Sequence, residues 1–149
     1  VSRNQKSEIA AGLAGRLWSL AIVLDRLDRL ESGSGAWLIG FKEQELPEAS
    51  QMMTLRAFGT VADPANYAIL QALASGESHK MGDLIMLTGH GRLPLSERLN
   101  DLVQVGLASR LIDTDHAQIT AAGDAIVQLI NEISGQTAKT LLERLEIGD

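Results

Sequence analysis

With 149 residues, of which 45% are hydrophobic and 21% charged, the chain has a globular balance that excludes the disordered class and fits one domain with at most an added oligomerisation segment. The chain has no cysteine, which excludes disulfides and zinc–thiolate sites, and only 3% aromatic residues, which leaves the core to aliphatic side chains that favour helices. The net charge of −6 argues against a strongly basic nucleic-acid binder. Most basic groups after residue 60 fall between Lys80 and Arg110, where we expect any anion-binding surface.

A leucine stripe predicts a long N-terminal helix over residues 7–31, with Ser7 as its N-cap and Glu31 near its end. A helix of this length with a leucine seam needs a partner helix. Packing inside the monomer is one alternative, but we favour a second subunit and assign residues 1–54 as a helical dimerisation extension. The seam has heptad spacing at Ala10, Leu13, Leu17, Leu20, Leu24 and Leu27.

The next segments show two helix starts. Residues 36–41 fit either a short strand or a buried loop. Pro47 suits the first turn of a helix that ends near Gly59. Asp63 is a predicted N-cap, because its carboxylate can accept the orphan backbone N–H groups of a helix that runs to about Ala74.

Two further helices and a hairpin follow. Residues 81–88 predict a short helix that ends at the Gly-His-Gly break of residues 89–91. Another helix begins around Pro94 and ends at Gly106. Residues 107–112 and 117–119 then read as two short strands around a polar turn. Thr120 caps a last helix toward Leu145, which Ser134 and Gly135 can kink or divide.

This order of elements is the plan of a winged helix-turn-helix domain, which we assign to residues 55–149. In that plan the helix from Pro94 is the recognition helix, whose outer face enters the DNA major groove. With Leu95, Leu99 and Leu102 inward, polar side chains face outward. The candidate DNA-binding residues are Ser96, Glu97, Arg98, Asn100 and Gln104 toward bases or backbone, and Arg92 and Arg110 toward phosphates.

The sequence also resembles a family. Residues 55–73, LRAFGTVADPANYAILQAL, resemble the opening of ArsR-type regulators, and residues 95–108, LSERLNDLVQVGLA, resemble their recognition helix and its exit. Residues 119–123, ITAAG, are similar to the segment after the wing in related MarR-type regulators. The resemblance covers about residues 55–130. It implies a mainly α winged helix-turn-helix fold with a short hairpin wing. It also implies a homodimeric, ligand-responsive repressor that binds double-stranded DNA. The helix of residues 7–31 and the C-terminal helix would hold the two subunits together.

Three departures from the family pattern bear on the site. The segment that carries cysteines in metal-sensing members has none here, and His79 with Asp83 does not complete a metal site, so we expect no metal. Glu97 stands where the family usually presents an arginine, and the turn of the hairpin carries Asp113 and Asp115. Carboxylates oppose binding to a polyanion. The alternative function is therefore a winged-helix protein–protein interaction module that does not bind DNA.

We expect no enzymatic activity and no cofactor. The three histidines fall in predicted loops without a nucleophile and acid at recognisable spacing. A small-molecule effector pocket could form between Trp18, Trp37, Met52 and Met53, although such side chains are more often core. The start of the chain lacks a signal-peptide pattern and the apolar runs are too short to span a bilayer, so we expect a cytoplasmic protein without membrane contact.

Overall fold

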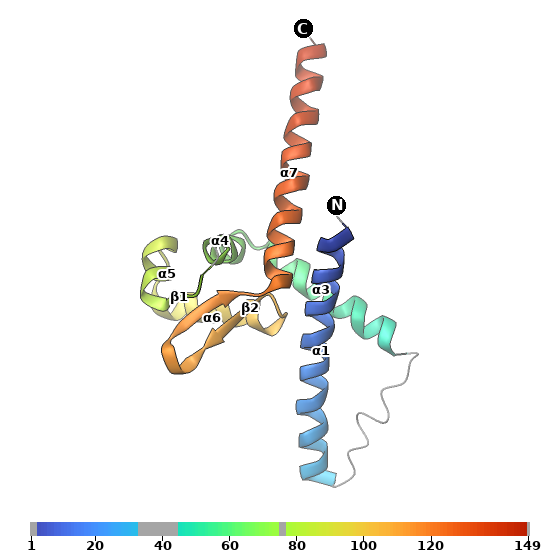
Figure 1. Ribbon diagram of the computed structural model, residues 1–149, viewed down its shortest axis with the longest axis vertical. Coiled ribbons are helices and arrows are strands. Elements are labelled where there is room, and N and C mark those ends of the chain that lie inside the picture. The colour runs from blue at the N-terminus through green and yellow to red at the C-terminus, as the bar shows by residue number, and fades with distance from the viewer. Residues whose placement is uncertain (1–2, 33–44, 75–76, 149) are drawn as a thin grey trace.

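The structure, a computed structural model, describes residues 3–32, 45–74 and 77–148 (Figure 1). This part of the chain is mainly helical with a small antiparallel sheet, which confirms the predicted mainly α class. The candidate strand or loop at residues 36–41 lies outside the described residues. The elements are, in chain order, α1 (Arg3–Ser32), α3 (Leu46–Ala62), α4 (Pro64–Leu73), β1 (His79–Lys80), α5 (Met81–Thr88), α6 (Arg92–Gln104), β2 (Ala108–Leu111), the 3-10 turn η1 (Ile112–Thr114), β3 (His116–Ile119) and α7 (Ala121–Ile147).

Helices α1 and α7 form an antiparallel pair (Figure 1). The buried side chain of Gln5 donates to the Oε1 atoms of Gln128 and Glu132, at 3.3 and 3.0 Å. About two turns further along α1, Gly12 lies against Ala122 near the start of α7. The absence of a side chain on Gly12 lets the two helices approach closely at this crossing.

The leucine seam of α1 packs partly inside the chain. Leu13 is buried, and Leu17 and Leu20 contact the core, as the intrachain alternative requires. The side chains of Leu24 and Leu27 lie outside the described residues. The predicted cap at Ser7 is wrong, because α1 begins at Arg3 and Ser7 lies within it.

The core fills the space between α4, α5 and α6. Asp63 caps α4 as predicted, with its Oδ1 accepting the N–H groups of Ala65 and Asn66 at 2.8 and 3.4 Å. The same core extends to Ile9 of α1 and Met53 of α3. Helix α3 runs to Ala62 rather than ending near Gly59, and it spans the position assigned as the domain boundary. The largest fully buried side chains are Ile69, Leu70, Leu73, Met81, Leu84, Leu95, Leu99, Leu102, Val105, Leu107 and Ile126.

The sheet has three strands in the order β1–β3–β2, all antiparallel. The predicted hairpin is confirmed as β2–β3, with Arg110 opposite Ala117. The third strand corrects the prediction of a loop around His79, which pairs with Ala117. A strand of two residues has no alternating pattern to read in a sequence, so only its pairing with β3 defines it.

Helix α7 begins at its predicted cap, since Thr120 Oγ1 accepts the N–H of Gly123 at 3.1 Å and donates to the carbonyl of Gly106 at 2.7 Å. The helix is continuous to Ile147, so the predicted kink or division at Ser134 and Gly135 is wrong. Its first turns are buried, whereas every side chain from residue 131 to residue 148 is exposed. This outer half projects beyond the N-terminus of α1 as a single helix (Figure 1).

Candidate nucleic-acid interface

Helix α6 presents a polar face to solvent. Its inner face buries Leu95, Leu99 and Leu102 completely, as the helical periodicity predicts. The exposed side chains on the opposite face include two carboxylates and two amides: Glu97, Asp101, Asn100 and Gln104. Asn and Gln can pair with adenine edges, and Glu can accept from cytosine. The face therefore offers base-reading groups and brings no positive charge of its own.

A cluster of basic and acidic groups joins the start of α6 to the hairpin. Arg92 Nη2 donates to Asp115 Oδ2 at 2.7 Å, and Arg110 Nη2 lies 3.6 Å from Asp115 Oδ1. Arg110 Nη1 also donates to the hydroxyl of Ser96 at 2.7 Å. The hydrogen bond from Arg92 is the main cause that lowers the pKa of Asp115 below its ordinary value. Three predicted site residues thus meet at one place, around a carboxylate.

Arg98 has a different environment from the other two arginines. Its Nη1 lies 3.1 Å from Asp63 Oδ2 and donates to Asn66 Oδ1 at 3.1 Å. The hydrogen bond from Arg98 is the main cause that lowers the pKa of Asp63, with the N–H of Ala65 second. Asn66 is buried and donates to the carbonyl of Thr60 at 3.0 Å. Arg98 therefore ties α6 to the junction of α3 and α4.

Gln104 joins the end of α6 to α1. Arg16 of α1 donates from Nε to the backbone carbonyl of Gln104 at 3.0 Å and from Nη2 to its side-chain oxygen at 2.7 Å. A guanidinium here satisfies an orphan carbonyl and complements the negative end of the helix dipole. Of the predicted site residues, Glu97 and Asn100 are the ones whose exposed side chains have no hydrogen bond or ion pair within the described ranges.

Large apolar side chains are exposed on α6 itself and on the elements before and after it in the chain. They lie at the end of α5, at the first turn of α6 and in the turn of the hairpin. Ile112, in that turn, is 84% exposed and Met86 is 85% exposed. Exposed apolar groups next to carboxylates are a feature of protein-binding surfaces more than of DNA-binding ones. The full set is Met86, Leu87, Leu93, Leu111 and Ile112.

His79, considered for a metal, adjoins the hairpin because β1 pairs with β3, whereas Met52 and Met53, considered for an effector, lie on α3. His79 is on β1 and Asp83 is exposed on α5, and no group of three ligating side chains converges within the described part of the chain. A small cavity of about 160 Å³ lies between α1 and α3, and Met52 and Met53 line it. Trp18 is absent from its lining and is 61% exposed, and Trp37 lies outside the described residues.

The chain matches no protein-family model and no curated protein. None of the helices in residues 3–32, 45–74 and 77–148 combines the length and apolar character that crossing a bilayer requires.

The role of Asp115 as a shared partner of two arginines is the feature that sequence reasoning missed. Asp115 was visible only as an acidic residue in a turn, because its partners lie 23 and 5 residues away in the chain.

Proposed function

We propose that this chain is a winged helix-turn-helix transcriptional regulator that binds double-stranded DNA as a homodimer. The observation that carries the proposal is the placement of α6. One face of this helix is locked in the core by three leucines, the other is exposed, and its first turn lies beside the β2–β3 hairpin. A recognition helix and a wing that flanks it need this arrangement. The resemblance to ArsR-type and MarR-type regulators over residues 55–130 supports the same function.

In this proposal α6 reads bases with Glu97 and Asn100, while Arg92 and Arg110, which converge beside the start of the helix, bind the phosphate backbone. Phosphate contacts dominate affinity for DNA, and each one adds about 0.9 to the slope of log affinity against log salt. Arg98 and Gln104 support the helix from within the protein. The net charge of −6 makes binding weaker than in a basic repressor.

The experiment is a gel-shift or fluorescence anisotropy titration with random duplex DNA at about 50 mM salt, where non-specific affinity is strongest. The double variant Arg92→Ala/Arg110→Ala should bind all sequences more weakly, with a shallower salt slope. A matched control is Lys6→Ala/Arg56→Ala, which removes two exposed basic groups from α1 and α3. Equal losses in the two double variants would reject the assigned phosphate contacts, and no binding by the wild-type protein would reject the function.

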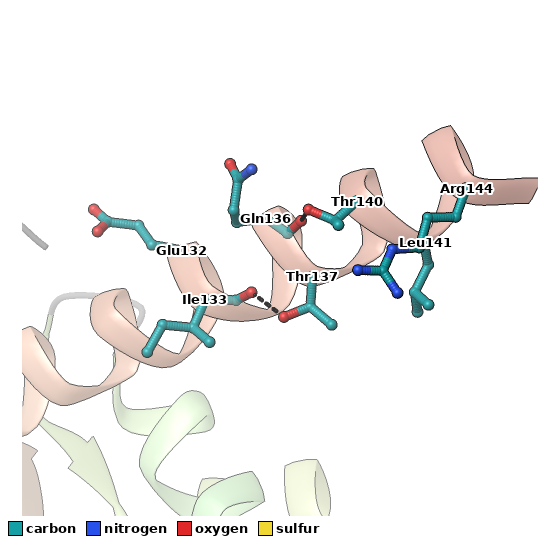
Figure 2. Close-up of a pocket in the computed structure, with 7 residues that line it drawn as sticks. All are labelled: Glu132, Ile133, Gln136, Thr137, Thr140, Leu141 and Arg144. Carbon is teal, nitrogen blue, oxygen red and sulfur yellow. Dashed lines mark hydrogen bonds between the residues drawn. The ribbon is translucent and has the colours of Figure 1, made fainter. Parts of the chain in front are cut away.

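The outer half of α7 supports the homodimer. A hollow of about 550 Å³ lies along one side of this helix, and Figure 2 labels the side chains that line it, among them Ile133 and Leu141, which are 54% and 57% exposed. The hydroxyl of Thr137 donates to the carbonyl of Ile133 at 2.8 Å, and the hydroxyl of Thr140 donates to the carbonyl of Gln136 at 2.9 Å. Burial of this face would therefore leave no hydroxyl hydrogen unpaired. Most helical stability in proteins comes from packing of one helix face, so the exposed outer half of α7 favours a helix that covers it.

The charges on this face fit a second copy of α7 in antiparallel orientation. Glu132 and Arg144 line the hollow at its opposite ends. In a two-fold interface each contact is reciprocal: if one residue of the first copy contacts another residue of the second, the same pair also meets with the copies exchanged. An antiparallel pair centred near residue 138 brings Glu132 of each copy to Arg144 of the other, whereas a parallel pair brings like charges together.

Leu141→Asp tests this interface against Leu142→Asp. The two leucines are equally exposed, at 57% and 58%, but only Leu141 lines the hollow. Burying about half of a leucine side chain contributes about 1 kcal/mol, and a two-fold interface loses it twice, so Leu141→Asp should raise the dimer dissociation constant about 30-fold or more. Sedimentation equilibrium measures this constant. Equal effects of the two variants would reject this face, and a monomeric wild-type protein would reject the dimer.

A second candidate function is a protein-interaction module built on the same fold. The exposed apolar side chains of Met86, Leu93 and Ile112, together with the exposed carboxylates of α6, favour it. The anisotropy titration separates the two functions, because a DNA-binding protein retains non-specific affinity for duplex DNA at low salt and a pure protein-binding module does not.

A further inference from the structure

We infer that Arg92, Ser96 and Arg110 form a phosphate-binding site whose internal occupant is the carboxylate of Asp115, and that a DNA phosphate displaces it. The inference rests on the proposed DNA-binding function and adds a regulatory element to it. In this reading Asp115 competes with DNA for the two arginines that α6 and β2 bring together. The alternative is that Asp115 orients the arginines for DNA, in which case removing its charge would weaken binding.

The site has the composition of an anion-binding site. Two guanidinium groups and one hydroxyl converge from α6 and β2, with Arg110 Nη1 donating to Ser96 Oγ at 2.7 Å. Arg92 and Ser96 are four residues apart and therefore lie on the same side of α6. Guanidinium groups suit phosphate because they offer several donors in a fixed plane. The chain itself demonstrates that the site accepts an anion, since it holds the Asp115 carboxylate.

The carboxylate of Asp115 is not what holds the turn in place. The backbone N–H of Asp115 donates to the carbonyl of Ile112 at 3.3 Å, and its carbonyl accepts the N–H of Met81 at 3.1 Å. Its φ of 52° is left-handed, a conformation that Asn and Gly adopt more readily than other residues. The backbone can therefore keep its shape when the side chain releases the arginines or is replaced.

The contacts to Asp115 are of a kind that a phosphate can replace. The side chains of Arg92 and Asp115 are 63% and 46% exposed, and exposed ion pairs contribute little net stability. The 3.6 Å separation of Arg110 Nη2 from Asp115 Oδ1 is longer than a hydrogen bond, and Arg110 Nε is buried without a hydrogen-bond partner in the described part of the chain. A phosphate offers more acceptor oxygens to the same donors than this carboxylate uses.

Asp115→Asn is the test, and Asp113→Asn is its control. Asp113 is an exposed carboxylate in the same turn, so its substitution removes the same charge without touching the arginines. Affinity for random duplex DNA is measured by fluorescence anisotropy from about 50 to 300 mM salt, a range in which phosphate contacts dominate. We expect Asp115→Asn to bind about tenfold more tightly than the wild type, and Asp113→Asn less than about threefold more tightly.

A second comparison assigns the gain to the two arginines. In the Arg92→Ala/Arg110→Ala background, Asp115→Asn should give no more gain than Asp113→Asn. Asp115→Gly, which also suits the left-handed φ, provides a second variant without a carboxylate if the first fails to fold. Weaker binding by Asp115→Asn, or a gain equal to that of Asp113→Asn, would overturn the inference while wild-type binding upheld the proposed function. An absence of DNA binding in every protein would overturn both.

Discussion

The same substitution at two glycines of α7 should have opposite effects on stability. A Cβ added at Gly123 would overlap the carbonyl oxygen of Leu107 and would lie 2.8 Å from Ile119 Cγ1. A Cβ added at Gly135 meets no atom within 4 Å. Gly123→Ala should therefore strain the junction of α7 with the sheet, whereas Gly135→Ala should stabilise the helix.

The magnitudes follow from the local contacts. Overpacking costs about 1 to 3 kcal/mol, and moving Leu107 also disturbs its carbonyl, which accepts the N–H of Thr120 at 3.1 Å. With about 1 kcal/mol for that hydrogen bond, Gly123→Ala should lower the free energy of unfolding by about 2 to 4 kcal/mol. Gly135→Ala should raise it by about 0.4 to 1 kcal/mol, because alanine has less backbone entropy to lose in a helix.

Thermal unfolding followed by circular dichroism at fixed protein concentration measures both effects. For a chain of this size about 1 kcal/mol shifts Tm by roughly 2 to 4 °C, so Gly123→Ala should melt about 4 to 16 °C lower and Gly135→Ala a few degrees higher. If Gly123→Ala failed to fold while Gly135→Ala folded, the result would agree with the predicted loss of stability. A Tm for Gly123→Ala at or above that of Gly135→Ala would refute the close approach of α7 to Leu107.

Two further predictions concern α1 and the cap of α4. Gly12→Ala should destabilise the protein by about 1 to 3 kcal/mol, because its Cβ would overlap that of Ala122. Gly15→Ala, with open space around it, should be neutral or stabilising. Urea unfolding measures both variants, and equal effects would reject the α1–α7 crossing. Asp63 has a folded-state pKa below its ordinary value of 3.8, so its contribution to stability is complete above that value and is lost as pH falls through the lowered pKa. Urea unfolding between pH 6 and pH 2 should therefore show a shallower acid loss in Asp63→Asn than in the wild type, and an identical pH profile would contradict the pairing with Arg98.

The elements that the sequence determined are those governed by local physics. Helix α5 has the bounds that its apolar spacing and its following glycine predict. The caps at Asp63 and Thr120 act on backbone groups two or three residues away, so the residue type alone identifies them. The inward face of α6 follows from the helical period of its leucines.

Some local signals were overridden. Ser7 is a good cap residue, but α1 begins earlier, at Arg3. The hydrogen bonds of the buried Gln5 to α7 stabilise this added turn. Gly135 is a weak helix former, yet α7 continues through it because one glycine costs only about 1 kcal/mol in a long helix. Short-range propensity decides an element only where tertiary contacts and neighbouring turns do not outweigh it.

The tertiary structure decided which charged residues of the candidate site pair with one another. A sequence lists arginines and aspartates but does not pair them, since ion pairs form across space rather than along the chain. Arg98 pairs with Asp63, 35 residues earlier, and Arg92 with Asp115, 23 residues later. The sequence by itself therefore determined that an exposed polar helix precedes a hairpin with an acidic turn. Only the folding of that hairpin against α6 brought a carboxylate to the two arginines proposed to bind phosphate.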